Sequence, residues 1–487
     1  MTKAPKPTSE SSVELEFKPF LRLGKYLSDD FIRIAEELLF LVGHFGLSHT
    51  PTAPSNEEEW RHFFCRVHEG WKLAQTKIAN LLIDALGRDV TARANIKEQH
   101  RSRNKAGQLE AKREAQRIAI EIRVLRRMLD VILWTIVSGE HATLRRLFVV
   151  DGAHSLSAKN ISEGMSVADS INAEPLLMAV CTDMLSLVHV GDLLVSDRLR
   201  GGISFIELKA GAKNLEISEA AQFAVQSGCQ KFDDLTRAEM SVKDAKHYER
   251  VKRQAERNKQ IIETIVNEVG IDQNTGANVR VSSVASPMLN WAQQIVDCYE
   301  QLGPTKKWAI TTVDECVYVG VYSDQRSAFV GFSSWMKVMK CTSRIYNLTD
   351  SFKMPWARPL GAMMLPLELQ KLIMRGEILV MICFDVAAMI EAVNEWQPGF
   401  LSLATARETA DARRGGYESL EVGGRIVKAT RDSHSWHIGA GLRDRVVFDQ
   451  QSPLQFMEHQ WESMANELAD IAAASVPGPN IGDRSPR

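Results

Sequence analysis

Two short apolar segments joined by a glycine-containing turn constrain the fold more than any other feature of this sequence. Residues 191–211 read GDLLVSDRLRGGISFIELKAG, so charged residues stand at both outer ends of the pair. Such segments predict two antiparallel strands. Side chains alternate between the faces of a strand, so Glu207 and Lys209 point the same way. Antiparallel pairing would bring Asp192 close to Glu207, and the sequence therefore predicts two carboxylates and one ammonium group in a cleft.

These three side chains have a shared chemical logic. Two carboxylates supply hard oxygen ligands for Mg²⁺ and leave coordination positions for water and a phosphate oxygen. The metal lowers the pKa of its bound water and neutralises charge at the phosphorus centre. A neighbouring lysine can orient or deprotonate the attacking water.

Asp192 and the triplet Glu207-Leu208-Lys209 resemble the D-x(n)-E-x-K signature of the PD-(D/E)XK nuclease superfamily, which has the restriction-endonuclease-like fold. The resemblance covers roughly residues 165–235, and Gly191 departs from the family's proline before the aspartate. It implies a mixed sheet flanked by helices. It also implies that Asp192 and Glu207 bind Mg²⁺, with Mn²⁺ as a substitute, and that Lys209 is the catalytic lysine.

The same resemblance implies supporting residues on the flanking helices. Glu174 is the candidate on the helix before the motif, and Gln222 is the candidate glutamine on the helix after it. Asp197 ranks below Asp192 as a ligand because it falls at the end of its strand, beside the turn. Two other interpretations stay open: a nuclease fold that keeps the trio only to bind nucleic acid or a partner, and a surface hairpin whose Glu207 and Lys209 form a solvated ion pair.

The charge pattern limits how nucleic acid could bind. The formal net charge is −2, so only local clusters of basic residues would attract phosphates. Residues 97–127 hold ten Lys and Arg against four Glu, and residues 236–268 form a second strongly charged helix. Each is either a solvated helix face or a phosphate-facing surface. We expect a nucleic-acid partner, with DNA favoured over RNA.

The chain divides by composition into several regions. We expect residues 1–18 and 476–487 to be disordered, 19–150 to form a helical domain, and 151–330 to hold the nuclease-like core with a helical insertion at 236–268. Within that core we expect helices at about 173–187 and 218–235. Residues 331–475 predict an additional C-terminal α/β region, with a short strand at 445–448. The predicted class is mixed α/β.

Seven scattered cysteines without a C-x-x-C pair indicate a reducing compartment. The longest apolar run, about 128–137, is too short to cross a bilayer, which needs roughly 20 residues. We therefore expect a cytoplasmic protein without a membrane partner. The sequence contains no P-loop, G-x-S-x-G or H-E-x-x-H motif, which argues against a P-loop motor and the corresponding hydrolases.

Two weaker candidates lie further along the chain. Asp314 and Glu315 begin a Val- and Tyr-rich segment and form either a second acidic site or the mouth of a hairpin. His434 and His437 have a metal-like spacing, but the surrounding sequence favours ordinary strand or loop histidines.

The expected function is that of a metal-dependent DNA endonuclease, suited to a bacterial defence (antiviral) or genome-maintenance effector. The regions outside the core would regulate it, recognise a target or form a homo-oligomer, and a regulatory protein partner is compatible with them. The alternative is a non-catalytic nucleic-acid-binding or scaffold protein built on a nuclease fold.

Overall fold

The computed structural model describes residues 23–50, 52–148, 156–188, 190–198, 202–208, 212–267, 269–271, 276, 278–280, 289–416, 418–432 and 434–474. The segments expected to be disordered, 1–18 and 476–487, and the side chain of Lys209 lie outside these residues. The chain forms two compact units. The first comprises Met1–Ser283, Thr349–Ala362 and Pro366–Glu377, and the second comprises Val284–Leu348, Met363–Leu365 and Ile378–Arg487. This division differs from the boundaries expected at 150 and 330.

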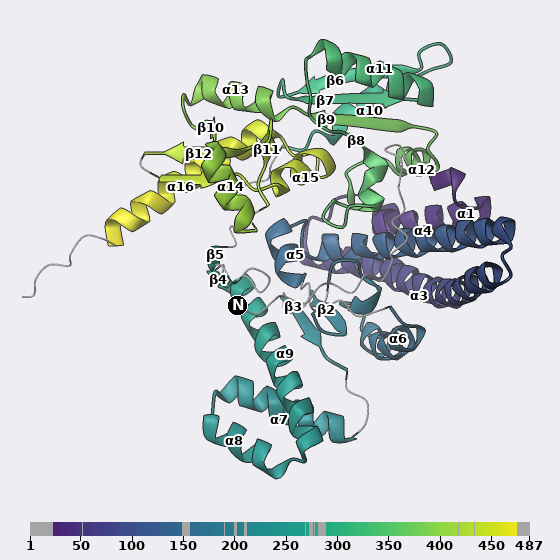
Figure 1. Ribbon diagram of the computed structural model, residues 1–487, viewed down its shortest axis with the longest axis vertical. Helices are drawn as coiled ribbons and strands as arrows, with labels where there is room; N and C mark the ends of the chain where they lie inside the picture. The colour runs from purple at the N-terminus through teal and green to yellow at the C-terminus, as the bar shows by residue number, and fades with distance from the viewer. Residues whose placement is uncertain are drawn as a thin grey trace, which may run out of the picture. The chain divides into compact units, whose positions relative to one another are not determined.

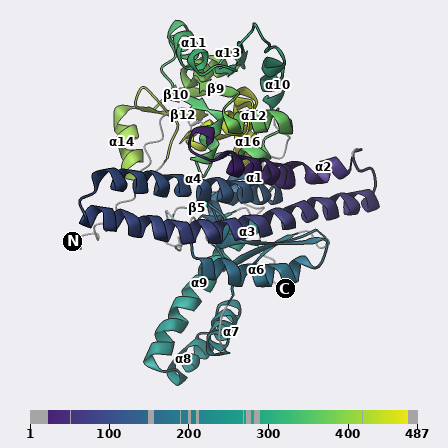
Figure 2. The ribbon, with the colours of Figure 1, turned by 90° about the vertical axis from the view of Figure 1, so that its right-hand side faces the viewer.

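Helices form the larger part of the first unit. The longest, α3 (Glu57–Arg101) and α4 (Lys105–Ile136), run side by side as a hairpin (Figure 2). One face of α4 is apolar and is buried at Ile118, Leu125, Leu129 and Ile132, as is typical of a helix that packs one apolar stripe against a core. Shorter helices of this unit include α1 (Asp29–Leu39), α2 (Phe45–His49), α5 (His141–Leu147) and α12 (Leu367–Arg375).

A three-stranded antiparallel sheet follows the helix α6 (Ala158–Asn172). Its strands are β1 (Leu177–Cys181), β2 (Leu193–Asp197) and β3 (Gly202–Ile206), in that spatial order. The predicted hairpin is confirmed. The helix predicted at 173–187 is wrong, because this segment contains β1 and a single 3₁₀ turn at Thr182–Met184. A short apolar run does not distinguish a buried strand from a helix by its period.

The outer edge of β1 is covered by side chains from two helices. Gln75 on α3 donates to the Ala179 carbonyl (2.9 Å) and accepts from the Cys181 amide (3.1 Å). Asn172 at the end of α6 bonds both backbone groups of Ala179. Gly164 allows α6 to approach the sheet, since a Cβ there would lie 2.7 Å from Cys181 Sγ. The helical region and the hairpin therefore share one core, which explains why no domain boundary falls near residue 150.

Three helices after β3 form a substructure that we call the helical arm: α7 (Ala212–Ser227), α8 (Gln230–Glu239) and α9 (Val242–Val266) (Figure 1). A single helix at 218–235 was expected, but Gly228 adopts φ +62° and separates α7 from α8. Such a left-handed backbone suits glycine at a helix end. The arm has its own small core, made by Ile217, Ala221, Ala224, Tyr248 and Val251. A strand pair, β4 (Val269–Ile271) and β5 (Asn278–Arg280), follows it.

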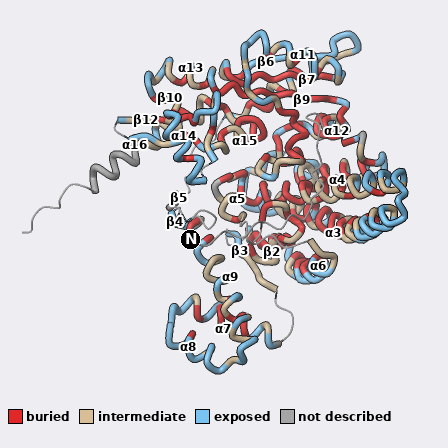
Figure 3. The backbone as a smooth tube through the Cα atoms, viewed as in Figure 1, coloured by how far each residue is buried: buried red, intermediate tan, exposed pale blue. Residues whose placement is uncertain are grey.

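The second unit contains two further antiparallel sheets. One has the order β6-β7-β9-β8, and the other has the order β10-β12-β11 with β13 paired to β12. Buried residues concentrate in the central strands β7 and β9 (Figure 3). The strand predicted at 445–448 is wrong, because these residues end the helix α15 (Gly441–Phe448).

The elements of this unit have the following bounds: α10 (Ala292–Glu300), β6 (Trp308–Val313), β7 (Val317–Tyr322), α11 (Gln325–Val338), β8 (Ile345–Asn347), β9 (Leu379–Phe384), α13 (Val386–Trp396), β10 (Leu401–Leu403), α14 (Ala406–Arg414), β11 (Glu421–Val422), β12 (Arg425–Arg431), β13 (His434–His437) and α16 (Pro453–Ala474). The chain is thus a mixed α/β protein, as predicted. Every strand pairing in its described residues is antiparallel, so the expected mixed sheet is not observed there. Within the same residues, no helix has both the length and the apolar character needed to span a membrane.

Candidate functional site

Asp192 and Glu207 occupy opposing positions at one end of the three-stranded sheet. The last paired residues of β2 and β3 are Leu193 and Ile206, so the next position on each side belongs to Asp192 and Glu207. The Asp192 amide donates to the Ile206 carbonyl at 2.8 Å, and the Leu208 amide donates to Asp192 Oδ2 at 2.5 Å. The antiparallel pairing therefore brings these two residues to the same end of the sheet, as the sequence predicts.

A tight turn before β2 fixes the position of Asp192. Gly191 has φ +68°, and a Cβ there would meet Phe205 Cβ at 3.1 Å and the Ile206 carbonyl oxygen at 3.3 Å. Thr182, at the end of β1, donates its amide to the Asp192 carbonyl (3.0 Å) and its hydroxyl to the Gly191 carbonyl (2.5 Å). Both the turn and the neighbouring strand therefore hold the backbone that carries the carboxylate.

Two amide side chains of α9 bind Glu207. Gln254 Nε2 donates to Glu207 Oε1 at 2.8 Å, and Asn258 Nδ2 donates to the same oxygen at 3.2 Å. The two residues are four apart, so they lie on one face of the helix. The sequence pattern did not predict these two residues, because the most obvious feature of this helix is its charge. The spacing of the two amides is the available signal, but their contact with a residue about fifty positions earlier depends on the tertiary fold.

Glu207 and Gln222 line one cavity of about 510 Å³ between β3, α7 and α9. Gln222 and Gln226 face it from α7, and Gln254 and Asn258 face it from α9. We call this space the amide cavity. Its other lining residues are Phe205, Ser218, Val225, Val251, Ala255, Lys259, Ile262 and Glu263.

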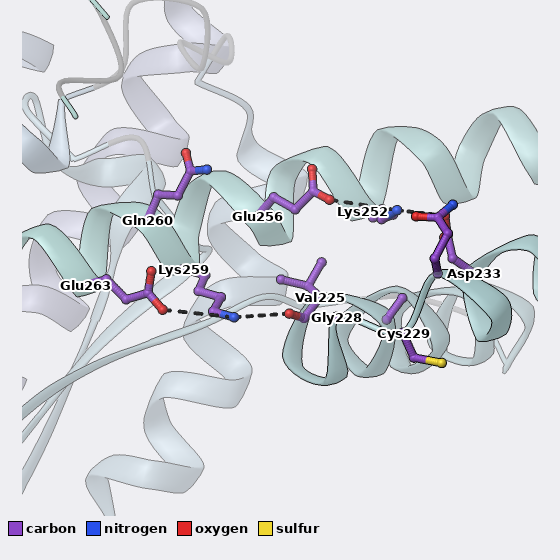
Figure 4. Close-up of a pocket in the computed structure, with 11 residues that line it drawn as sticks. Val225, Gly228, Cys229, Asp233, Lys252, Glu256, Lys259, Gln260 and Glu263 are labelled. Carbon is purple, nitrogen blue, oxygen red and sulfur yellow. Dashed lines mark hydrogen bonds and ion pairs between the residues drawn. The ribbon is translucent and has the colours of Figure 1, made fainter. Parts of the chain in front are cut away.

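A second cavity of about 370 Å³ lies nearby, among the end of α7, the start of α8 and α9 (Figure 4). Its charged side chains bond one another or the backbone: Lys252 bonds Asp233 at 2.8 Å, and Lys259 donates to the Val225 carbonyl at 3.1 Å. Asp233 also accepts from the Tyr248 hydroxyl at 2.7 Å. Burial favours the neutral form of Asp233, but the hydrogen bonds from Lys252 and Tyr248 outweigh it and lower the pKa of this carboxyl. These contacts join α8 to α9.

Glu174 does not lie with Asp192 and Glu207. It is an exposed residue of the turn between α6 and β1, not a residue of a flanking helix as expected. That turn precedes Leu177, which pairs with Asp197 at the far end of β2. Because a strand rises about 3.3 Å per residue, Asp197 and Asp192 are separated by about 16 Å along β2. The structure thus places Asp192 opposite Glu207, puts Gln222 in the same cavity as Glu207, and leaves Glu174 and Asp197 at the other end of the sheet.

Negative charge gathers where β1 and β2 meet the site. Burial, together with the charges of Asp183 and Asp192, raises the pKa of the Cys181 thiol to about 12. Asp183, in the 3₁₀ turn after β1, was not singled out from the sequence. Its field and that of Asp192 both favour a cation near this end of the sheet.

At the end of the first basic segment, two arginines are used inside the fold and not on a phosphate-facing surface. Arg127 on α4 is buried, donates to the carbonyls of Ser351 and Pro355 at 3.1 Å each, and pairs with Asp130 at 2.7 Å. Arg126 donates to the backbone carbonyls of Met184 and Leu185. These guanidinium groups therefore serve the fold. On α9, by contrast, Lys246, Arg250 and Arg253 are exposed and spaced by four and three residues, which makes one stripe.

The side chains present are compatible with a Mg²⁺ ion. Among the described residues, no group of three or more His, Cys, Asp or Glu side chains could hold a metal ion. Mg²⁺, however, keeps several waters and is commonly bound through one or two carboxylates and substrate phosphates. A carboxylate offers about four lone-pair sites, so the hydrogen bonds to Asp192 and Glu207 do not by themselves prevent coordination.

The weaker candidates from the sequence lie in the second unit. Asp314 and Glu315 have φ +48° and +56° in the turn between β6 and β7, and the Leu454 amide donates to Asp314 at 3.3 Å. They form the mouth of a hairpin. His434 and His437 lie on β13.

Comparison with protein families, curated proteins and solved structures finds no match for this chain. Its chemistry is therefore inferred from the geometry of the site.

Proposed function

We propose that this protein is a metal-dependent endonuclease that hydrolyses phosphodiester bonds of DNA. The observation that carries the proposal is the register of β2 and β3, which sets Asp192 opposite Glu207. Two opposed carboxylates at the end of a sheet, with a glutamine on the following helix, match what the PD-(D/E)XK resemblance implies. We infer the restriction-endonuclease-like fold on the same basis.

The proposed roles follow from the contacts. Asp192 and Glu207 would hold Mg²⁺, which when bound lowers the pKa of a water and neutralises charge at the phosphate. The Leu208 amide fixes the Asp192 carboxylate, while Gln254 and Asn258 fix that of Glu207. Ligands held by neighbouring hydrogen bonds keep the geometry a metal requires. Lys209 lies two residues after Glu207 in the sequence and would position the attacking water. Gln222 on α7 would support the same site.

The exposed stripe on α9 supplies a surface for the phosphate backbone. Replacing Lys246, Arg250 and Arg253 together with serine should weaken DNA binding and flatten its dependence on salt, because each lost phosphate contact removes about 0.7–0.9 from the slope of log K against log salt. A control variant removes two cations elsewhere, Arg407 and Arg414, which are exposed residues of α14. An unchanged slope in the α9 variant would remove this stripe from the binding surface.

Cleavage assays test the catalytic proposal. The full chain is incubated with supercoiled plasmid, linear duplex, single-stranded DNA and RNA, each with Mg²⁺, Mn²⁺ or EDTA. We expect metal-dependent cutting that falls by about 100-fold or more in Asp192→Asn, Glu207→Gln and Lys209→Ala. Asp197→Asn is the matched control, since it alters a carboxylate of the same strand at the opposite end of the sheet. Cutting that survives in all three variants would contradict the proposed centre.

The second candidate is a non-catalytic nucleic-acid-binding or scaffold protein on the same fold. The observation that favours it is that both carboxylates accept hydrogen bonds within the fold, as structural acids do. Calorimetric titration with Mn²⁺ separates the two functions. Nucleic-acid binding without cutting, and without metal binding that depends on Glu207, would support the scaffold.

A further inference from the structure

The amide cavity has two matched pairs of amide side chains on facing helices. Gln222 and Gln226 are four residues apart on α7, and Gln254 and Asn258 are four residues apart on α9. Each pair occupies one helix face. An amide presents donors and an acceptor in one plane, which is also how the edge of a nucleobase is built. This set of side chains therefore suits a flat heterocycle with mixed donors and acceptors.

The apolar part of the cavity suits the same occupant. Phe205 on β3 contributes an aromatic ring, and Val225, Val251 and Ile262 contribute aliphatic surface. Aromatic side chains stack on nucleobases of any sequence. The volume of about 510 Å³ falls within the range of small-molecule sites, roughly 300–1,000 Å³. A base and its sugar would fit such a space.

Charge in the cavity is balanced and localised. Lys259 lies 3.9 Å from Glu263 and donates to the Val225 carbonyl, so its ammonium group is already engaged. Glu207 is the remaining carboxylate, and Gln254 and Asn258 bind it. The cavity therefore offers an uncharged base a better match than it offers a phosphate, which needs cationic partners.

We propose that the amide cavity receives one unpaired nucleobase of the nucleic acid that is cut. This inference rests on the proposed function, because Glu207 is both a wall of the cavity and a proposed metal ligand. The base in the cavity would then belong to a nucleotide beside the scissile phosphate. A base inside a duplex must first be unstacked and unpaired, which opposes binding. Single strands or locally unpaired sites are therefore the preferred substrates.

The test measures binding in EDTA, so that it does not depend on cleavage. The probes are a fluorescent oligothymidylate, an abasic oligonucleotide of the same length and a duplex containing the thymidylate strand. Fluorescence anisotropy gives their dissociation constants for the full chain. Gln226→Leu removes an exposed amide of the cavity, and Phe205→Leu removes the aromatic face while keeping an apolar side chain on β3. Gln293→Leu, on the exposed face of α10, is the control, and circular dichroism melting checks that each variant folds.

We expect the oligothymidylate to bind at least about fivefold more tightly than the abasic probe, as stacking of a base predicts. This ratio should fall toward one in Gln226→Leu and Phe205→Leu and stay unchanged in Gln293→Leu. Equal binding of the two single-stranded probes, a ratio that neither cavity variant changes, or a duplex bound as tightly as the single strand would each overturn the inference. A base-dependent ratio in a protein that never cuts would instead contradict the endonuclease proposal alone.

Discussion

Asn258 and Glu207 are 51 residues apart in the chain, yet the side-chain nitrogen of Asn258 lies 3.2 Å from Glu207 Oε1. Gln254 reaches the same oxygen from one turn earlier on α9. The helical arm therefore completes the surroundings of this carboxylate, although the resemblance identified only the hairpin and its adjoining helices.

These two amides should support catalysis without touching the substrate's phosphate. Replacing Gln254 and Asn258 together with leucine should lower metal-dependent cutting by about 10–100-fold, because Glu207 would lose the hydrogen bonds that orient it. The Mg²⁺ concentration needed for half-maximal cutting should rise. Gln230→Leu is the control, since this glutamine lies in the same arm and bonds Asp234. If the double variant cuts DNA with the same Mg²⁺ dependence as the wild type, the hydrogen bonds that orient Glu207 are not needed for catalysis.

Gly191→Ala should destabilise the first unit. A non-glycine residue at φ +68° costs about 1–2 kcal/mol, and the added Cβ would also press on Phe205. Gly202→Ala is a matched control, because a Cβ at Gly202 meets no atom within 4 Å. In urea denaturation, the midpoint concentration of urea should therefore fall for Gly191→Ala and stay unchanged for Gly202→Ala. Equal midpoints for the two variants would argue against the strained turn.

His68 should make the first unit less stable in mild acid. Burial lowers the pKa of this imidazole to about 4, from an ordinary 6.5, although its ring nitrogen Nδ1 bonds the Pro175 carbonyl. The unfolded chain binds the proton more readily, so stability is full above pH 6.5 and is lost as the pH falls toward 4. The loss amounts to about 3 kcal/mol.

Urea unfolding at neutral and acidic pH measures this effect. His68→Gln should reduce the difference in unfolding free energy between the two conditions, and His62→Gln, at an exposed position of the same helix, should not. The prediction fails if both variants keep the wild-type pH dependence.

In the second unit, Cys341 should react faster with thiol reagents than burial alone suggests. Its sulfur lies 3.5 Å from Cys383 Sγ, and a hydrogen bond from the Cys383 thiol lowers the pKa of Cys341. Mass spectrometry can follow the alkylation rate of Cys341 from neutral to alkaline pH. In Cys383→Ala, the pH profile of this rate should shift to higher pH, because the Cys341 thiolate loses its hydrogen-bond donor. The exposed Cys229 serves as an internal reference for the reagent. An unshifted profile would exclude this hydrogen bond.

The sequence predicts local structure well where the period of apolar residues agrees with the turn-forming residues at the ends of the segment. The hairpin of β2 and β3 is confirmed. The opposition of Asp192 and Glu207 followed from the same pattern, because a side-chain period of two fixes which residues share a face.

Other features depend on contacts that no local pattern reveals. The run at Leu177–Cys181 is too short for its period to distinguish a strand from a helix, and the error placed Glu174 on a helix that does not exist. Arg126 and Arg127 lie in a segment whose composition is typical of a solvated helix. Their side chains nevertheless donate to backbone carbonyls of segments distant in the sequence. Gln254 and Asn258 gain significance only when α9 lies beside β3.

The contacts of Gln75 and Asn172 also limit how copies of this chain could associate. A neighbouring molecule that extended the three-stranded sheet at β1 would have to bond the backbone of Ala179 and Cys181, and these groups already have partners inside the chain. Fibre-like growth or dimerisation by β-augmentation is therefore blocked on that side. A second copy that extended this three-stranded sheet would have to pair with β3 at its other edge.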